Sequence, residues 1–488
     1  MPENESLSSK VVKGGFWVFA TRIFERGLGF IRIIILARIL SPNDFGLFGI
    51  LLLSISTLET FSQTGFQSAL VQKKEKIESY LDTAWTILAV RGLILYTLLF
   101  FSAPLIAEFF DASRASFFIR IVGITTLFRG FSNIGTVYFQ KEIRFNKKFI
   151  LQLVTNIVEF IVAVILAYTL KNVWALVISQ LIGGFSGLIT GYIIHPYRPK
   201  FQFDKKKAKE LFNYGKWLTG LGIVVFIATQ GDDIFLGKIL GTTALGIYQL
   251  SYRLSNSVAT EITHLISQIT FPAYSKIKDN YTRLKNAFLN TYSLTISLTF
   301  LIATGIFLLI PEFVNLFLGQ KWIAIISPVR ILVIAGLLRS IIALLGPLYK
   351  SLDRPNLAFY KNVIRVIITF TPLYYLIDSF GVEGASLAVL CGIIGAIGFD
   401  IYFLAELADI DFKLTQFLQK TIPVILGSIP AIIIIISAKL FSEINILIFA
   451  VTVIFSSFTY FSTLYYLNKK YNPEIIGKLF SIYKNMKS

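Results

Sequence analysis

Long apolar stretches alternate with short polar connectors along the whole chain. Each stretch is roughly 20 residues long, which is the length that an α-helix needs to cross the hydrocarbon core of a bilayer. A transmembrane β-barrel would instead show segments of about ten residues with strict alternation. The pattern predicts an all-α polytopic membrane protein with about 14 transmembrane helices, at 12–37, 45–71, 80–103, 116–139, 148–169, 173–194, 211–236, 244–271, 287–310, 324–349, 357–377, 382–405, 416–438 and 444–466.

Composition agrees with this class. The 488 residues are 55% hydrophobic and their mean hydropathy is +0.69, which is too apolar for a soluble protein. The single cysteine, Cys391, excludes an intrachain disulfide and a thiolate metal cluster, and with only two histidines no metal site is expected. The N-terminus lacks the layout of a cleaved signal peptide, so the first helix is expected to remain in the mature protein.

The connectors are rich and poor in lysine and arginine by turns. The net charge of +18 is concentrated in every second connector, for example at 141–148, 198–209 and 276–285. Because cytoplasmic loops carry the Lys/Arg excess, these connectors and both termini are expected on the cytoplasmic side of a bacterial inner membrane. The same charge suits the headgroups of anionic membrane lipids, and its distribution disfavours a nucleic-acid role.

The sequence also repeats itself at a shift of 200 to 210 positions. Segment 38–48 is similar to 238–248, and Arg129 corresponds to Arg339. Two halves with an even number of helices enter the membrane from the same side, which predicts a parallel repeat. The expected organisation is an N-terminal six-helix lobe at 1–195, a cytoplasmic linker at 196–210, a C-terminal six-helix lobe at 211–408, and two accessory helices with a basic tail at 409–488.

The first predicted helix carries charge on one face. Arg22, Glu25 and Arg26 fall within about 100° of one another, and Arg32 lies at the edge of this arc. Burying such charges in lipid costs at least about 2.5 kcal/mol each, so the face is expected to meet water or a partner. An ion pair of Glu25 that only joins helices is the alternative, and the surplus of arginine favours an anionic ligand instead.

Polar stripes on other helices are expected to complete one cavity shared by the two lobes. Guanidinium groups donate two hydrogen bonds at once and stay charged in a low dielectric, which suits phosphate. The predicted substrate-binding residues are Arg22, Glu25, Arg26, Arg32, Glu59, Gln63, Arg129, Lys216, Arg253, Glu261, His264 and Arg339. Further arginines lie within predicted helices, at Arg91, Arg120, Arg330 and Arg365. The sequence leaves functional and structural roles open for four carboxylates: Glu159, Asp232, Asp233 and Asp400.

The opening of the chain resembles a known family of transporters. A basic first helix is followed by Ala37-Arg-Ile-Leu-Ser-Pro-Asn-Asp-Phe-Gly-Leu-Phe48 and then by Gly65-Phe-Gln-Ser-Ala-Leu-Val-Gln72. This pattern is similar to the polysaccharide transporter family of the multidrug/oligosaccharidyl-lipid/polysaccharide exporter superfamily, nearest to the Wzx-type flippases of O-antigen, colanic acid and teichuronic acid.

The resemblance implies two six-helix lobes in a V shape that work by alternating access. It implies transfer of a polyprenyl-pyrophosphate-linked oligosaccharide to the outer leaflet, with Arg22, Arg26 and Arg32 holding the pyrophosphate. The glycosyltransferases and the polymerase of the same pathway are then candidate partners.

Three other functions are alternatives to transport of a lipid-linked oligosaccharide. A lipid II flippase and an ion-coupled multidrug antiporter share the fold that the resemblance implies, although several cavity arginines disfavour cationic drugs. A membrane enzyme such as a polysaccharide polymerase is expected to have a sizeable outer loop, and the predicted connectors are short. Without a Walker A loop, ATP hydrolysis is not expected. No cofactor is expected, and a proton or sodium gradient stays open as the energy source.

Overall fold

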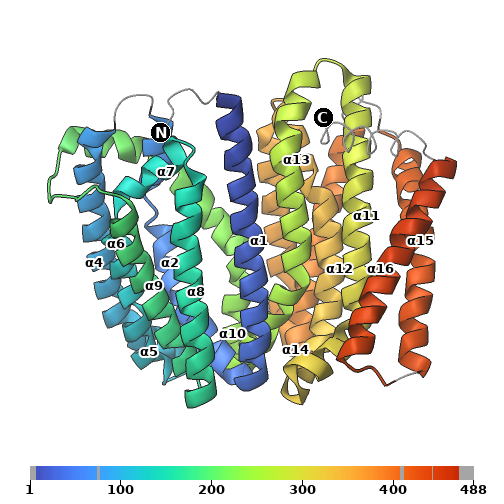
Figure 1. Ribbon diagram of the computed structural model, residues 1–488, viewed down its shortest axis with the longest axis horizontal. Helices are drawn as coiled ribbons and strands as arrows, with labels where there is room; N and C mark the ends of the chain where they lie inside the picture. The colour runs from blue at the N-terminus through green and yellow to red at the C-terminus, as the bar shows by residue number, and fades with distance from the viewer. Residues whose placement is uncertain (1–6, 74–76, 407–411, 442, 472–488) are drawn as a thin grey trace. The chain divides into compact units, whose positions relative to one another are not determined.

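The computed structural model describes residues 7–73, 77–406, 412–441 and 443–471, which are almost entirely helical (Figure 1). Within these residues, nine helical segments are long and apolar enough to span a membrane, or ten if the bent pair Ala115–Gly130 and Ile134–Lys141 counts as one span. The chain is therefore an all-helical, multi-pass membrane protein, as its sequence predicts.

Contacts divide the chain into two compact units, Met1–Gly246 and Ile247–Ser488. The first unit contains α1 (Leu7–Ile39), α2 (Pro42–Phe61), α3 (Phe66–Gln72), α4 (Glu78–Phe109), α5 (Ala115–Val122), α6 (Ile124–Gly130), η1 (Ile134–Thr136), α7 (Val137–Lys141), α8 (Phe145–Leu170) and α9 (Trp174–Ile194). It also contains the first part of α10 (Lys205–Ile277).

This division falls later than the linker predicted at 196–210, and the packing of α10 gives the reason. Nζ of Lys238 lies 2.8 Å from Oδ2 of Asp111, and the rings of Phe226 and Phe61 pack edge to face. The first 42 residues of α10, 205–246, thus belong to the first unit by their contacts.

Two of the helices are broken at glycine. α10 has 73 residues, which as one straight helix would be about 110 Å long, far more than the roughly 30 Å core of a bilayer. It changes direction at Gly241, with φ of 79°. α14 (Pro355–Glu406) breaks in the same way at Gly381, with φ of 59°. A positive φ costs little conformational energy only for glycine. α10 and α14 therefore each consist of two helices, and the breaks lie where the sequence predicts separate spans.

The predicted span 45–71 is interrupted. α2 ends at Phe61, and α3 begins at Phe66 after Gly65, whose φ is 65°. Irregular backbone at membrane depth needs hydrogen-bond donors for its free carbonyl groups. Arg91 of α4 supplies them, because Nε donates to the carbonyl oxygen of Ser62 at 2.8 Å and Nη2 donates to that of Glu59 at 2.9 Å.

The second unit contains the rest of α10, α11 (Tyr281–Phe313), η2 (Val314–Leu318), η3 (Gln320–Ile325), α12 (Ile326–Ala343), α13 (Leu345–Ser351), α14, α15 (Leu414–Phe441) and α16 (Ile446–Tyr471). Its core includes the buried rings of Tyr274, Phe288, Tyr349 and Tyr460. α15 and α16 pack against each other and on α11. Their remaining faces expose apolar side chains such as Leu440, Ile454 and Phe458, as expected of accessory helices that face lipid.

A proline kink in the first unit is stabilised by an arginine. Pro104 in α4 has no N–H group, so the carbonyl oxygen of Phe100 loses its helical donor. Nε of Arg120 donates to that oxygen at 3.1 Å, and its guanidinium group lies 4.8 Å from the centre of the Phe100 ring. Arg120 therefore satisfies the backbone of the neighbouring helix.

The second unit repeats this arrangement, with the proline and phenylalanine 207 positions later and the arginine 210 positions later. Pro311 in α11 frees the carbonyl oxygen of Phe307. Nε of Arg330 donates to it at 3.2 Å, and the guanidinium lies 5.4 Å from the ring centre of Phe307. The same proline, aromatic residue and arginine in equivalent positions support the internal duplication.

Candidate functional site

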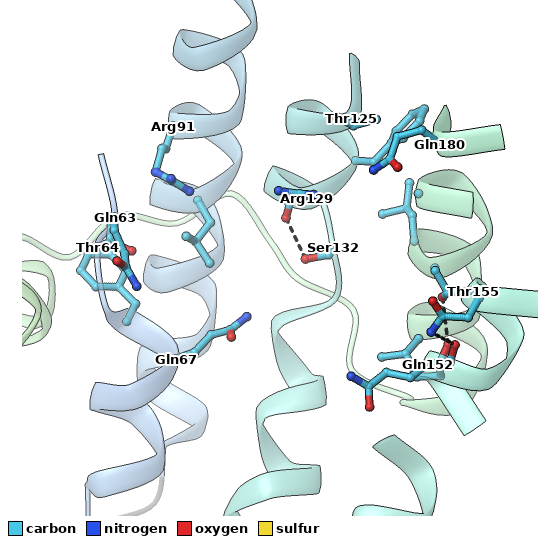
Figure 2. Close-up of a pocket in the computed structure, with 18 of the residues that line it drawn as sticks. Gln63, Thr64, Gln67, Arg91, Thr125, Arg129, Ser132, Gln152, Thr155 and Gln180 are labelled. Carbon is cyan, nitrogen blue, oxygen red and sulfur yellow. Dashed lines mark hydrogen bonds between the residues drawn. The ribbon is translucent and has the colours of Figure 1, made fainter. Parts of the chain in front are cut away.

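A polar cavity lies within the first unit (Figure 2). Its volume is about 770 Å³, and its walls come from α1, the α2–α3 break, α4, α6, α8 and α9. This volume is in the range of sites that hold small molecules or head groups, about 300–1,000 Å³. The irregular backbone at 63–65 belongs to the lining, which is where such backbone is tolerated at membrane depth.

Amide and hydroxyl groups dominate the polar lining. Figure 2 shows Gln63 and Gln67 on one side of the cavity, and Gln152 and Gln180 on the other. Each amide carries two N–H donors and an acceptor oxygen, so the walls match groups that both donate and accept, such as sugar hydroxyls.

Arg129 brings positive charge to this lining. Its Nη1 donates to Oε2 of Glu59, which joins α6 to α2. The Arg129 side chain is 56% exposed, whereas that of Glu59 is 22% exposed. A guanidinium has five N–H donors. Among the described residues, the Arg129 side chain uses its Nη1 in the hydrogen bond to Glu59. The remaining donors can therefore serve an anion in the cavity.

Two carboxylates complete the charged lining. Glu159 of α8 pairs with Arg32 of α1, and their side chains are 16% and 23% exposed. Glu25 lies in the electrostatic field of Arg22 and Arg26 on its own helix and of Lys148 on α8. Both carboxylates thus have cationic partners, and they hold α1 against α8.

The structure therefore brings together part of the predicted set. Glu25, Gln63 and Arg129 line the cavity, and Glu59 and Arg32 are the ion-pair partners of lining residues. Arg22 is half-buried and Arg26 is exposed, and the described lining includes neither.

The other predicted residues lie elsewhere. The side chains of Lys216, Glu261 and His264 fall outside the described residues. In the second unit, Arg253 is exposed, and Nη1 of Arg339 donates to Oη of Tyr252 at 2.8 Å and to Oδ1 of Asn256 at 3.0 Å. A cavity shared by both lobes stays a prediction.

Sequence reasoning missed one wall of the cavity. Gln152, Thr155, Asn156 and Glu159 all line it from α8. Their spacing of i, i+3, i+4 and i+7 is the signal of one helical face. A search of the predicted span 148–169 for polar periodicity would have found them.

Asp232 and Asp233 were left open between a cavity role and a solvated position. They are 6% and 8% exposed, which excludes ordinary solvated residues. The described lining does not include them.

Outside the spans, an exposed cluster fastens the start of α10 to α4. Nζ of Lys73 and Oη of Tyr80 each donate to Oε2 of Glu210 at 2.8 Å. These two hydrogen bonds, that from Lys73 first, hold the pKa of Glu210 below its ordinary value. The carboxylate is therefore ionised at neutral pH.

Comparisons with known proteins are consistent with this geometry. A family model described as "Polysaccharide biosynthesis protein" matches residues 35–327. The lipopolysaccharide biosynthesis protein WzxC of Escherichia coli K12 is 26% identical over 74% of this chain and 74% of its own length. The succinoglycan biosynthesis transport protein ExoT of Rhizobium meliloti 1021 is 22% identical over 74% of this chain and 73% of its own length.

Among solved structures, the lipid II flippase MurJ in an inward closed conformation matches with a TM-score of 0.75 at 14% identity, over 94% of this chain and 99% of that chain. At this identity the match shows the fold alone. The family match covers more than half of the chain, and it confirms the resemblance seen in the sequence. The chain belongs to the polysaccharide biosynthesis family of Wzx-like flippases within the multidrug/oligosaccharidyl-lipid/polysaccharide exporter superfamily.

Proposed function

We propose that the protein moves a polyprenyl-pyrophosphate-linked oligosaccharide across the bacterial inner membrane by alternating access, for the assembly of a surface polysaccharide such as O-antigen or an exopolysaccharide. Family membership supports transport in polysaccharide biosynthesis. Lipid II and cationic drugs are other cargoes that this fold can carry, and the export assay below separates them from an oligosaccharide.

The polar cavity of the first unit is the observation that carries this proposal. The polar head of such a lipid cannot cross hydrocarbon unaided, whereas the polyprenyl chain can stay in the membrane. Amide walls suit the sugar hydroxyls, and the exposed guanidinium of Arg129 suits a phosphate. A phosphate that binds Arg129 competes with Glu59 for the same guanidinium group, so cargo entry exchanges one ion pair for another.

The arginines of α1 and of the second unit have a supporting role in this proposal. Arg22, Arg26 and Arg32 form the positive surface of α1 beside Glu25. Arg339 and Arg253 contribute positive charge from the second unit. The glycosyltransferases and the polymerase of the pathway remain candidate partners.

We also propose fourteen transmembrane helices with both termini and the basic connectors in the cytoplasm. The ten candidate spans become fourteen when α1 is added, α14 is counted as two helices and both parts of α10 are included. α1 is not among the ten candidate spans because of the charged residues that it carries.

Filling the cavity tests the proposal. A Cβ atom at Gly184 of α9 would lie 3.4 Å from the ring of Phe128, so the indole of Gly184→Trp takes up space within the cavity. We expect this variant to reach the membrane and to lower surface polysaccharide at least about tenfold. Export is measured as polysaccharide on the surface of cells that lack their own flippase.

Gly398→Trp on α14 is the matched control. Gly398 is exposed, and a Cβ atom there meets open space within 4 Å. This variant should export normally. Normal export by Gly184→Trp would contradict the assignment of the cavity.

A further inference from the structure

The second unit buries a lysine and an aspartate together. Lys361 lies on the first part of α14 and is 7% exposed, and Asp400 lies on the second part and is 2% exposed. Nζ of Lys361 is 3.5 Å from Oδ2 of Asp400, and it donates to the carbonyl oxygen of Ile342 at 3.0 Å. Oη of Tyr349 donates to Oδ1 of Asp400 at 2.8 Å.

One oxygen of this carboxylate is incompletely satisfied. Among the described residues, Oδ2 of Asp400 accepts no hydrogen bond of good geometry. Phe399 and Phe403 pack on the same core cluster as Tyr349. A buried charge without full hydrogen bonding is costly. Oδ2 is therefore an atom to which a proton can add without breaking a hydrogen bond, at the expense of the ion pair with Lys361.

The polar and charged groups near this pair come from α12, α13, α14 and α16. Tyr349 on α13 faces Asp400, and Arg365, one turn beyond Lys361 on α14, acts on Lys361. α12 contributes the carbonyl oxygen of Ile342. The hydroxyl of Tyr460 on α16, in the same core, is directed to the carbonyl oxygen of Ser297.

Two ion pairs of the first unit use arginine instead, in Arg32–Glu159 and Arg129–Glu59. Arginine stays protonated in proteins, whereas both members of the Lys361–Asp400 pair can change protonation state.

We propose that Lys361, Asp400 and Tyr349 form a proton-binding site in the second unit, with Oδ2 of Asp400 as the atom that takes up and releases the proton. The proton comes from water and returns to it. Uptake turns the carboxylate into a neutral acid and ends its ion pair with Lys361, while Lys361 keeps its bond to the carbonyl oxygen of Ile342.

Protonation changes how four helical segments are joined. The ion pair holds the two parts of α14 together, and the hydrogen bonds of Tyr349 and Ile342 tie α13 and α12 to the same point. Lys361 is six residues from the start of α14, which is about 9 Å along the helix. The step from proton binding to driven transport rests on the proposed function; proton binding itself does not.

Infrared spectroscopy of the full chain in lipid bilayers, without cargo, tests the site. We expect a carbonyl band of a protonated carboxylic acid that disappears as the pH is raised. Asp400→Asn should remove this band. The matched control Glu159→Gln, which neutralises a carboxylate paired with arginine, should leave it unchanged. A band that is absent in the wild type, or unchanged in Asp400→Asn, overturns the proposal.

The double variant Lys361→Met/Asp400→Asn separates a proton site from a purely structural ion pair. Replacing both members of a buried pair commonly preserves folding, so this variant should reach the membrane in normal amounts. We expect export of polysaccharide by the wild type to depend on external pH, and export by the double variant not to depend on it. An unchanged pH dependence would overturn the coupling to transport. The infrared result does not depend on export by Gly184→Trp, so either proposal can fail while the other holds.

Discussion

The two units use equivalent arginines in different ways. In the first unit Arg129 makes an ion pair with Glu59 beside the cavity. Arg339 lies 210 positions later and donates to the neutral groups of Tyr252 and Asn256. The charge of Arg129 is thus balanced by an acid that an anionic cargo can replace, whereas that of Arg339 is held by neutral acceptors.

Arg120 and Arg330 show the opposite behaviour. Each donates to the carbonyl oxygen that a proline four residues later leaves free, and each covers the ring of the same residue. Where an arginine satisfies the backbone, both units keep the arrangement. At Arg129, which lines the cavity, and at its equivalent Arg339, the partners differ. The role of an arginine within a span therefore follows from the group that it contacts and not from its depth in the membrane.

The largest expected effect separates Arg129 from Arg339. Arg129→Gln leaves Glu59 without its cation and removes the exposed guanidinium from the cavity, so export should fall at least about tenfold. Arg339→Gln breaks hydrogen bonds to neutral groups, and export should fall by less than about fivefold. Polysaccharide at the cell surface, divided by the amount of transporter in the membrane, measures both.

An exchange of charges sharpens this prediction. Glu59→Arg/Arg129→Glu restores an ion pair between α2 and α6 but moves the cation. The exchanged protein should fold and still fail to export. Equal losses for Arg129→Gln and Arg339→Gln would remove the distinction between the units.

An intermediate effect is expected at the proline kinks. Arg120→Gln and Arg330→Gln should each lower the free energy of unfolding by about 1–3 kcal/mol, because a carbonyl group within a helix that the proline leaves free also loses its side-chain donor. Pro104→Ala returns an N–H group to the carbonyl oxygen of Phe100. The double variant Pro104→Ala/Arg120→Gln should therefore be more stable than Arg120→Gln alone. Thermal unfolding in detergent measures all of these, and a double variant no more stable than Arg120→Gln would argue against the cap.

The smallest effect is expected at the exposed cluster of Lys73, Tyr80 and Glu210. Hydrogen bonds from Lys73 and Tyr80 lower the pKa of Glu210, so this carboxylate stabilises the fold above its ordinary value of 4.5 and loses that contribution as the pH falls through the lowered pKa. Glu210→Gln should lower the melting temperature slightly at neutral pH. In acid the melting temperatures of variant and wild type should converge, and a difference that grows on acidification would contradict the assignment.

Hydropathy predicted the helical class and most spans, because both follow from the length and spacing of apolar stretches. The duplication was predicted from similar segments at a shift of 200 to 210 positions. Hydropathy did not reveal the break after Phe61, since apolar residues resume at Phe66 and the predicted span 45–71 reads as continuous. The cue is local: three polar residues and Gly65 interrupt the apolar run. The proline kinks also had a cue, since Pro104 and Pro311 recur at the repeat shift.

Partners of charged side chains were beyond the reach of the sequence. Periodicity tells which face of a helix is polar, but not which helix lies opposite. Glu59 and Arg129 are 70 residues apart, and Lys361 and Asp400 are 39 apart. The polar face of α1 carries Arg22, Glu25, Arg26 and Arg32. Of these, the described lining of the cavity includes Glu25. A face about 100° wide holds several side chains, and packing on α8 decides which of them point inward.

Transfer by the purified protein tests the central claim most directly. The protein is placed in liposomes that contain a fluorescent polyprenyl-pyrophosphate oligosaccharide, and an impermeant quencher reports how much of the lipid has changed leaflet. We expect transfer by the wild type and by Gly398→Trp, and a loss of at least about tenfold for Gly184→Trp. Transfer by Gly184→Trp at the rate of the wild type would contradict the claim that the head group occupies the cavity of the first unit.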